Sequence, residues 1–123
     1  MNLKVCIVWE QFEYGGVDSY LSYLINSWPE QNDRFTILYN EGNSGAERLK
    51  NELITFRNVK FIKYKTFFNY NRSTNILSKI FKLVKHILLP ILFFLNSLRL
   101  YFIIKGKKFD ILLAQNGGYP ASY

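Results

Sequence analysis

The sequence contains one cysteine, one histidine and one methionine among its 123 residues, and these scarcities exclude several kinds of site. A single cysteine, Cys6, cannot form an intramolecular disulfide, which favours a reducing compartment. His and Cys do not cluster and no close set of carboxylates is present, so the sequence predicts no metal site. Cys6 lies in an apolar run and is expected in the core, whereas His86 is expected in a solvated position.

Acidic residues are nearly absent from the second half of the chain. Residues 1–53 carry 4 basic and 8 acidic side chains, a net of −4, whereas residues 54–123 carry 12 basic and 1 acidic, a net of +11. The basicity therefore predicts an anionic partner for the second half. Its lysines and arginines are interleaved with large aliphatic residues rather than with exposed aromatics, which argues against nucleic acid as that partner.

A long apolar leader is also missing from the start of the sequence. The first apolar run, VCIVW, is short, and Glu10 and Glu13 follow it at once, so no secretory signal is expected. With 49% hydrophobic and 20% charged residues, the composition is that of a globular domain, and the length allows one. We therefore expect a cytoplasmic protein.

Apolar runs alternate with helical patterns along the chain. Strands are predicted at residues 3–9, 35–40, 59–64 and 109–115, the first of them buried on both faces, and helices at 17–28 and 45–54. This alternation indicates an α/β fold, a Rossmann-like parallel sheet with helices on both faces. The usual strand order for such a sheet is 3-2-1-4, which places the first and fourth strands side by side.

The segment 74–105 is both basic and apolar. Up to residue 88, aliphatic residues fall on one side of a helix and lysines on the other, which is typical of a helix on an anionic membrane surface. Beyond Pro90 the segment is apolar nearly all round, with Arg99 inside it. We expect a kinked pair of helices that cover the sheet and contact a membrane; a buried hairpin and a true span are the alternatives. The predicted membrane-facing residues are Lys79, Lys82, Lys85, Arg99 and Lys105.

Glycine pairs follow the first and fourth predicted strands. Gly15 and Gly16 precede the first helix, and Gly117 and Gly118 follow the last strand, so both pairs are expected to open into one crevice. We predict a ligand-facing role for both pairs, although the full G-x-G-x-x-G motif is absent. Asp18, in the first helical turn, favours sugar hydroxyls there as readily as a phosphate. The alternative is that the glycines only form turns.

The opening KVCIVWEQFEYGGVDSYL and the closing FDILLAQNGGYP resemble the start of a retaining family 4 glycosyltransferase with the two-domain glycosyltransferase-B fold. The resemblance covers essentially the whole chain, but only the amino-terminal, acceptor-side domain of that family. It implies that Gly15, Gly16 and Asp18 line the cleft where donor phosphate and acceptor meet. It also implies that Asn116, Gly117 and Gly118 face this cleft from the fourth strand.

The resemblance implies a role in surface polysaccharide or glycan biosynthesis. The chain would be the acceptor-binding half of an enzyme that moves a sugar from a nucleotide-sugar donor to a lipid-linked acceptor at the inner face of the membrane. No cofactor is expected in this chain, because the family binds its donor through a carboxyl-terminal domain. That domain would be supplied in cis or in trans, and this chain is expected to be inactive alone.

Two departures from the family pattern leave the catalytic residues unassigned. A histidine often found near the cleft has no counterpart, because Gln115 and Asn116 occupy the end of the fourth strand. The sequence also ends where Pro120 reads as the start of a next helix, so a truncated or split product is expected. The alternative function is a non-catalytic module that binds a membrane surface.

Overall fold

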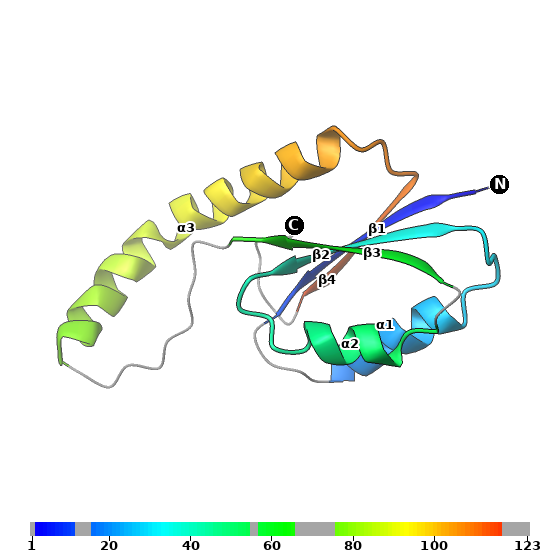
Figure 1. The fold of residues 1–123 in the computed structure, drawn as a ribbon. Coiled ribbons are helices and arrows are strands. Elements are labelled where there is room, and N and C mark those ends of the chain that lie inside the picture. Colours follow the sequence, from blue (N-terminus) through cyan, green and yellow to red (C-terminus); the bar gives the residue numbers. More distant parts are fainter. Residues whose placement is uncertain (1, 12–15, 55–56, 66–75, 117–123) are drawn as a thin grey trace.

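The structure, a computed structural model, describes residues 2–11, 16–54, 57–65 and 76–116 (Figure 1). The elements, in chain order, are β1 (Lys4–Glu10), α1 (Gly16–Asn26), β2 (Arg34–Asn40), α2 (Ala46–Glu52), β3 (Asn58–Tyr64), α3 (Ile76–Lys105) and β4 (Ile111–Asn116). The four predicted strands and the predicted helices at 17–28 and 45–54 are present, and their ends lie within two residues of the prediction.

The four described strands form one parallel sheet in the order β3-β2-β1-β4. This confirms the predicted order and places β1 beside β4. Residues Val5–Trp9 of β1 are all buried, because this strand has a neighbour on each side and helices on each face. Its unbroken apolar sequence is what a strand buried on both faces requires.

Helices cover both faces of the sheet, as expected for a Rossmann-like α/β fold (Figure 1). On one face, Trp9 and Phe35 belong to a core cluster that includes Leu21 and Ile25 of α1 and Leu49 of α2. The second core cluster joins the opposite face of the sheet to α3, and its buried members are Cys6, Val8, Leu38, Tyr64 and Leu100. Because successive side chains of β1 point to opposite faces of the sheet, this strand contributes residues to two separate cores.

The segment after residue 75 differs from its prediction. It forms one continuous helix of 30 residues with Pro90 inside it, rather than a pair of helices or a buried hairpin. Proline removes one hydrogen bond from a helix interior, but the long runs of helix-forming residues on both sides of Pro90 continue through it. Among the described helices, none is both long and apolar enough to cross a bilayer.

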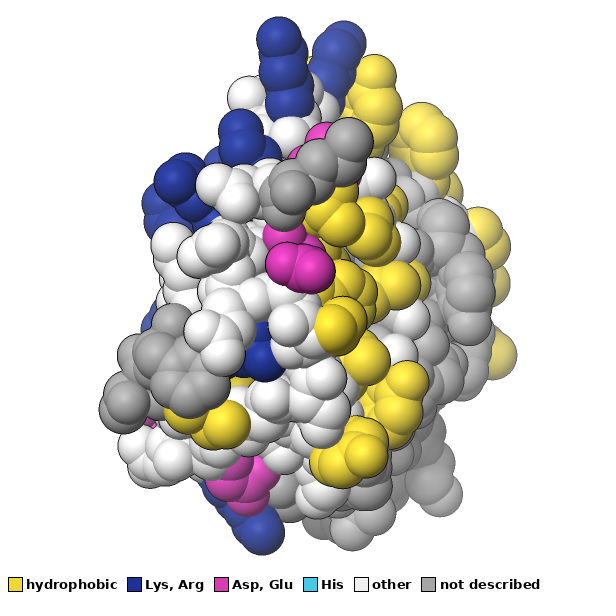
Figure 2. All heavy atoms as spheres, turned by 90° about the vertical axis from the view of Figure 1, so that its right-hand side faces the viewer, with side chains coloured by type: hydrophobic (Ala, Val, Ile, Leu, Met, Phe, Trp, Pro, Cys, Tyr) yellow, Lys and Arg dark blue, Asp and Glu magenta, His cyan; other side chains and the backbone are white. Residues whose placement is uncertain are grey.

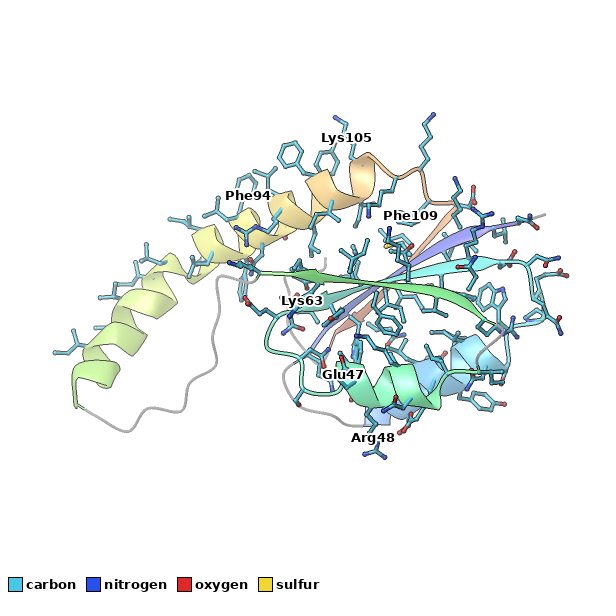
Figure 3. All side chains as sticks on the ribbon, viewed as in Figure 1. Glu47, Arg48, Lys63, Phe94, Lys105 and Phe109 are labelled. Carbon is cyan, nitrogen blue, oxygen red and sulfur yellow. The ribbon has the colours of Figure 1, made fainter. Side chains whose placement is uncertain are left out.

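Among the side chains of α3 that the structure describes, those that belong to a core cluster lie in its second half. Leu100, Ile103 and Ile104 belong to the second core cluster, whereas the first half extends past the strands (Figure 1). The helix exposes many large apolar side chains, and Phe94 points away from the sheet (Figure 3). These exposed residues are Ile80, Leu83, Val84, Ile87, Leu88, Ile91, Phe94, Leu95, Leu98, Tyr101 and Phe102.

Two carboxylates fix the start of β1 at the amino edge of the sheet. Asp33 is fully buried and accepts hydrogen bonds from the Leu3 amide (2.8 Å) and from the Trp28 indole N–H (2.9 Å). Asp110 accepts one from the Lys4 amide (2.7 Å), and its own amide donates to the Lys4 carbonyl. The start of β1 is thereby hydrogen-bonded to the residue that precedes β2 and to the residue that precedes β4.

Replacing Asp33 by alanine is expected to lower the free energy of unfolding by about 2–4 kcal/mol, because two part-buried N–H groups lose a charged acceptor. Urea denaturation monitored by tryptophan fluorescence measures this change. Glu30→Ala, an exposed acid in the same loop, is the control and should change stability by less than about 0.5 kcal/mol. Equal effects of the two substitutions would contradict the role assigned to Asp33.

Candidate functional site

The carboxyl edge of the sheet is polar, in contrast to the apolar strands that lead to it. The strands end at Glu10, Asn40, Tyr64 and Asn116. Asn40 pairs with Tyr64 and Glu10 pairs with Asn116, while Glu10 and Asn40 directly follow the pair Trp9 and Tyr39. The four residues therefore form one row across the sheet, which we call the edge row. Open parallel α/β sheets bind their ligands at this edge.

Three side chains of the edge row are almost fully buried. Glu10 is 3% exposed, Asn40 0% and Tyr64 5%. Each has a polar atom without a hydrogen-bond partner within the described part of the chain: Glu10 Oε2, Asn40 Nδ2 and the Tyr64 hydroxyl. Buried polar atoms are nearly always paired with protein, water or ligand. The edge row therefore holds hydrogen-bonding capacity that the described protein groups do not use.

Burial sets the protonation of the edge row. It raises the pKa of the Glu10 carboxyl from 4.5 to about 7, because the charged form loses its hydration. The pKa of the Tyr64 phenol is also raised, first by burial and then by the negative charge of Glu10. Near neutral pH, Glu10 is thus divided between a carboxylate, which only accepts hydrogen bonds, and a carboxylic acid, which also donates one.

Asp18 is connected to the edge row through Gln11. The Gln11 side-chain amide donates to Asp18 Oδ2 (2.9 Å), and the Gln11 backbone amide donates to Asn40 Oδ1 (2.8 Å). Asp18 is fully buried in the first turn of α1. Asp18, a predicted site residue, therefore lies near the carboxyl end of β1, as expected. The Gln11 side chain is one of its hydrogen-bond partners. Its contact with a ligand stays a prediction.

The other predicted crevice residues are described in part. Gly16 is the first residue of α1 and Asn116 the last of β4, so each lies at the carboxyl end of one of the two adjacent strands. Gly15, Gly117 and Gly118 lie outside the described residues. The structure thus confirms the adjacency on which the prediction depended, and the ligand-facing role of the glycines stays a prediction.

The predicted membrane-facing residues are distributed along α3. Lys79, Lys82 and Lys85 lie in its first half, and the structure does not describe their side chains. Arg99 is half-buried and donates from Nη1 to the backbone carbonyl of Lys65, just after β3. Lys105 is exposed at the end of the helix, with its ammonium 5.4 Å from the centre of the Tyr101 ring (Figure 3). Arg99 thus has a partner on the sheet side.

Sequence reasoning did not single out Glu10, Asn40 or Tyr64 as site residues. Glu10 directly follows the predicted strand 3–9, and Asn40 and Tyr64 end the predicted strands 35–40 and 59–64, and these positions were the available signal. Comparisons of the chain with protein-family models, with curated proteins and with solved structures find no match in any of the three. The fold and the edge row therefore carry the functional argument.

The raised pKa of Glu10 predicts a pH-dependent stability. The folded state binds this proton more tightly than the unfolded chain, so the stabilisation is complete below pH 4.5 and is lost as the pH rises through 7. We expect Glu10 to lower the free energy of unfolding by about 3 kcal/mol between pH 4.5 and 8. Urea denaturation across this range should show a steeper decline for the natural chain than for Glu10→Gln. Glu41→Gln, an exposed control, should keep the steep decline.

Proposed function

We propose that this chain is the acceptor-binding half of a glycosyltransferase of surface polysaccharide or glycan biosynthesis. The observation that carries the proposal is the side-by-side placement of β1 and β4. It brings Gln11, directly after β1, and Gly16, at the start of α1, to the same edge of the sheet as Asn116. A crevice at such a reversal of strand order is where α/β sheets bind nucleotides and sugars.

The polar groups at this edge suit a sugar. Hydroxyl groups both donate and accept hydrogen bonds, and the edge row offers amide, phenol and carboxyl groups that complement both roles. The resemblance in the opening and closing motifs favours a sugar over the other ligands that this fold can bind. The nucleotide-sugar donor would be bound by a second domain, in cis or in trans, which would also stabilise the leaving phosphate.

The surface of α3 supports a lipid-linked acceptor. The helix exposes a series of large apolar side chains, and Lys105, Lys107 and Lys108 are exposed at its end. Apolar residues combined with lysines are the features of a helix that lies on an anionic membrane surface. A peripheral position on the inner membrane face would bring the crevice close to an acceptor held in the lipid.

A non-catalytic membrane-binding module is the second candidate, because α3 would serve it equally well. The two candidates differ at the carboxyl edge. We expect methyl glycosides of glucose, galactose and N-acetylglucosamine, tested singly at millimolar concentration, to include one that shifts the amide resonances of Gln11, Gly16 and Asn116. Asp33 and Asp110, at the amino edge, should not shift. Asn116→Ala should weaken these shifts, and a chain that responds to none of the sugars would favour the second candidate.

Membrane binding is tested separately with the apolar side chains of α3. We expect the chain to float with vesicles that contain phosphatidylglycerol and not with neutral vesicles. Replacing both Ile87 and Phe94 by glutamate should reduce the bound fraction at least about tenfold, because each exposed side chain would otherwise contribute apolar area to the interface. Tyr23→Glu, at an exposed position of α1, is the matched control. Flotation that is insensitive to the α3 substitutions would contradict the proposed role of this helix.

A further inference from the structure

Three buried side chains of the edge row lie on the same face of the sheet. Glu10 and Asn40 come two residues after Val8 and Leu38, and side chains two positions apart in a strand share a face. Val8, Leu38 and Tyr64 belong to the core cluster under α3, so all three edge-row side chains face α3. Adjacent strands are about 4.8 Å apart, which makes these side chains neighbours. The negative charge of Glu10 accordingly contributes to raising the pKa of Tyr64.

The hydrogen-bonding capacity of this cluster matches one hydroxyl group. Asn40 Oδ1 accepts from the Gln11 backbone amide (2.8 Å), so the other end of its side-chain amide, Nδ2, is a donor. Ionised Glu10 offers Oε2 as an acceptor, and the Tyr64 hydroxyl can donate. A hydroxyl has one hydrogen and two lone pairs, which suit one acceptor and two donors. A phosphate would be repelled by Glu10, and an ammonium has no lone pair for Asn40.

α3 covers this part of the sheet. Leu100 packs with Tyr64 in the core cluster, and Arg99 donates to the carbonyl of Lys65, the residue that follows β3. Asn96 lies one helical turn before Leu100, on the same side of α3, and is 1% exposed. The contact between α3 and the sheet is therefore apolar around Leu100 and becomes polar toward the carboxyl edge (Figure 1).

Burial distinguishes the edge row from the charged groups at the other end of the sheet. At the amino edge, which faces the viewer in Figure 2, basic and acidic side chains reach the surface, where water hydrates them. Glu10, Asn40 and Tyr64 are instead buried, with polar atoms that the described protein groups leave without a partner. Such atoms cost free energy that a bound hydroxyl removes. The cluster therefore favours a bound hydroxyl over an empty interface.

We propose that the edge row binds one hydroxyl of the acceptor sugar beneath α3, which donates to Glu10 Oε2 and accepts from Asn40 Nδ2 and the Tyr64 hydroxyl. This inference rests on the proposed function, which supplies the sugar. The sugar ring would lie beyond the strand ends, near Asn116, with one hydroxyl directed toward α3. Water can make the same hydrogen bonds, so the experiment must distinguish a sugar hydroxyl from water.

The contact with Glu10 makes sugar binding depend on pH. Burial raises the pKa of Glu10 to about 7, and a hydroxyl that donates to the carboxylate lowers this pKa by favouring the ionised form. The affinity for the sugar should therefore rise about tenfold between about pH 5 and about pH 8. The surrounding elements bring these other titratable or charged groups to this end of the described structure: Tyr64, Asp18, Arg99 and the exposed Glu41, Lys63 and Lys65.

Nuclear magnetic resonance tests the contact directly, through the carboxyl carbon of Glu10 and the side-chain amide of Asn40. The probes are the methyl glycosides of glucose, galactose and N-acetylglucosamine, added singly across this pH range. We expect the glycoside that shifts the Asn116 amide to shift both groups and to lower the pKa of Glu10. Glu10→Gln should bind this glycoside about tenfold more weakly at about pH 8 and lose the pH dependence.

Tyr64→Phe separates binding from structure, because it removes only the phenol hydroxyl. It should weaken sugar binding about fivefold and leave the midpoint of urea denaturation unchanged. Tyr39→Phe is the matched control, since Tyr39 lies on the opposite face of the neighbouring strand, against Phe61 and Lys50. This variant should keep the affinity of the natural chain.

The outcomes separate this inference from the proposed function. A glycoside that shifts Asn116 but leaves the Glu10 carboxyl and the Asn40 amide unchanged would overturn the inference alone, with water as the occupant of the edge row. PH dependence that persists in Glu10→Gln would overturn it too, as would a Tyr64→Phe variant that loses stability without losing affinity. A chain that responds to none of the glycosides would overturn both.

Discussion

The burial of β1 on every side is the constraint on which the rest of the structure depends. This strand pairs with β2 and β4, and its alternate side chains enter the two cores on opposite faces of the sheet. Without β1, β4 would lose its neighbouring strand in the described sheet. The core under α3 and the core under α1 and α2 would also lose the strand that they share. The position of the polar carboxyl edge follows from the same strand, because Glu10 and Gln11 are where the apolar sequence of β1 gives way to polar residues.

Much of the fold could be predicted from periodicity. The apolar runs predicted the four strands, of which β1 is buried on both faces, and their alternation with helical patterns predicted a parallel sheet whose order the structure confirms. The continuity of α3 could not be predicted from Pro90, since the penalty for one proline is local and the flanking helix-forming residues outweigh it. Which half of α3 packs on the sheet likewise depends on the contacts of Leu100 with residues of the strands. The pattern of a single segment does not contain these contacts.

The site was predictable only in outline. The glycine pairs and strand order pointed to the crevice between β1 and β4, and Asp18 and Asn116 lie at that end of the sheet. Glu10, Asn40 and Tyr64 come from three separate strands, and their common row exists only once the parallel register is set. Register depends on the whole set of strand and helix contacts, so a linear reading could find each residue without finding the row.

The hydrogen bonds between Lys4 and Asp110 join residues that are 106 positions apart in sequence. During translation β1 leaves the ribosome well before β4, the strand that completes its second edge. β1, β2 and β3 can pair in the meantime through short connections, yet the outer backbone groups of β1 must wait for β4. During this period the outer backbone groups of β1 can pair with a wrong strand. Its length depends on the translation of α3, the longest described element, which separates β4 from its partners.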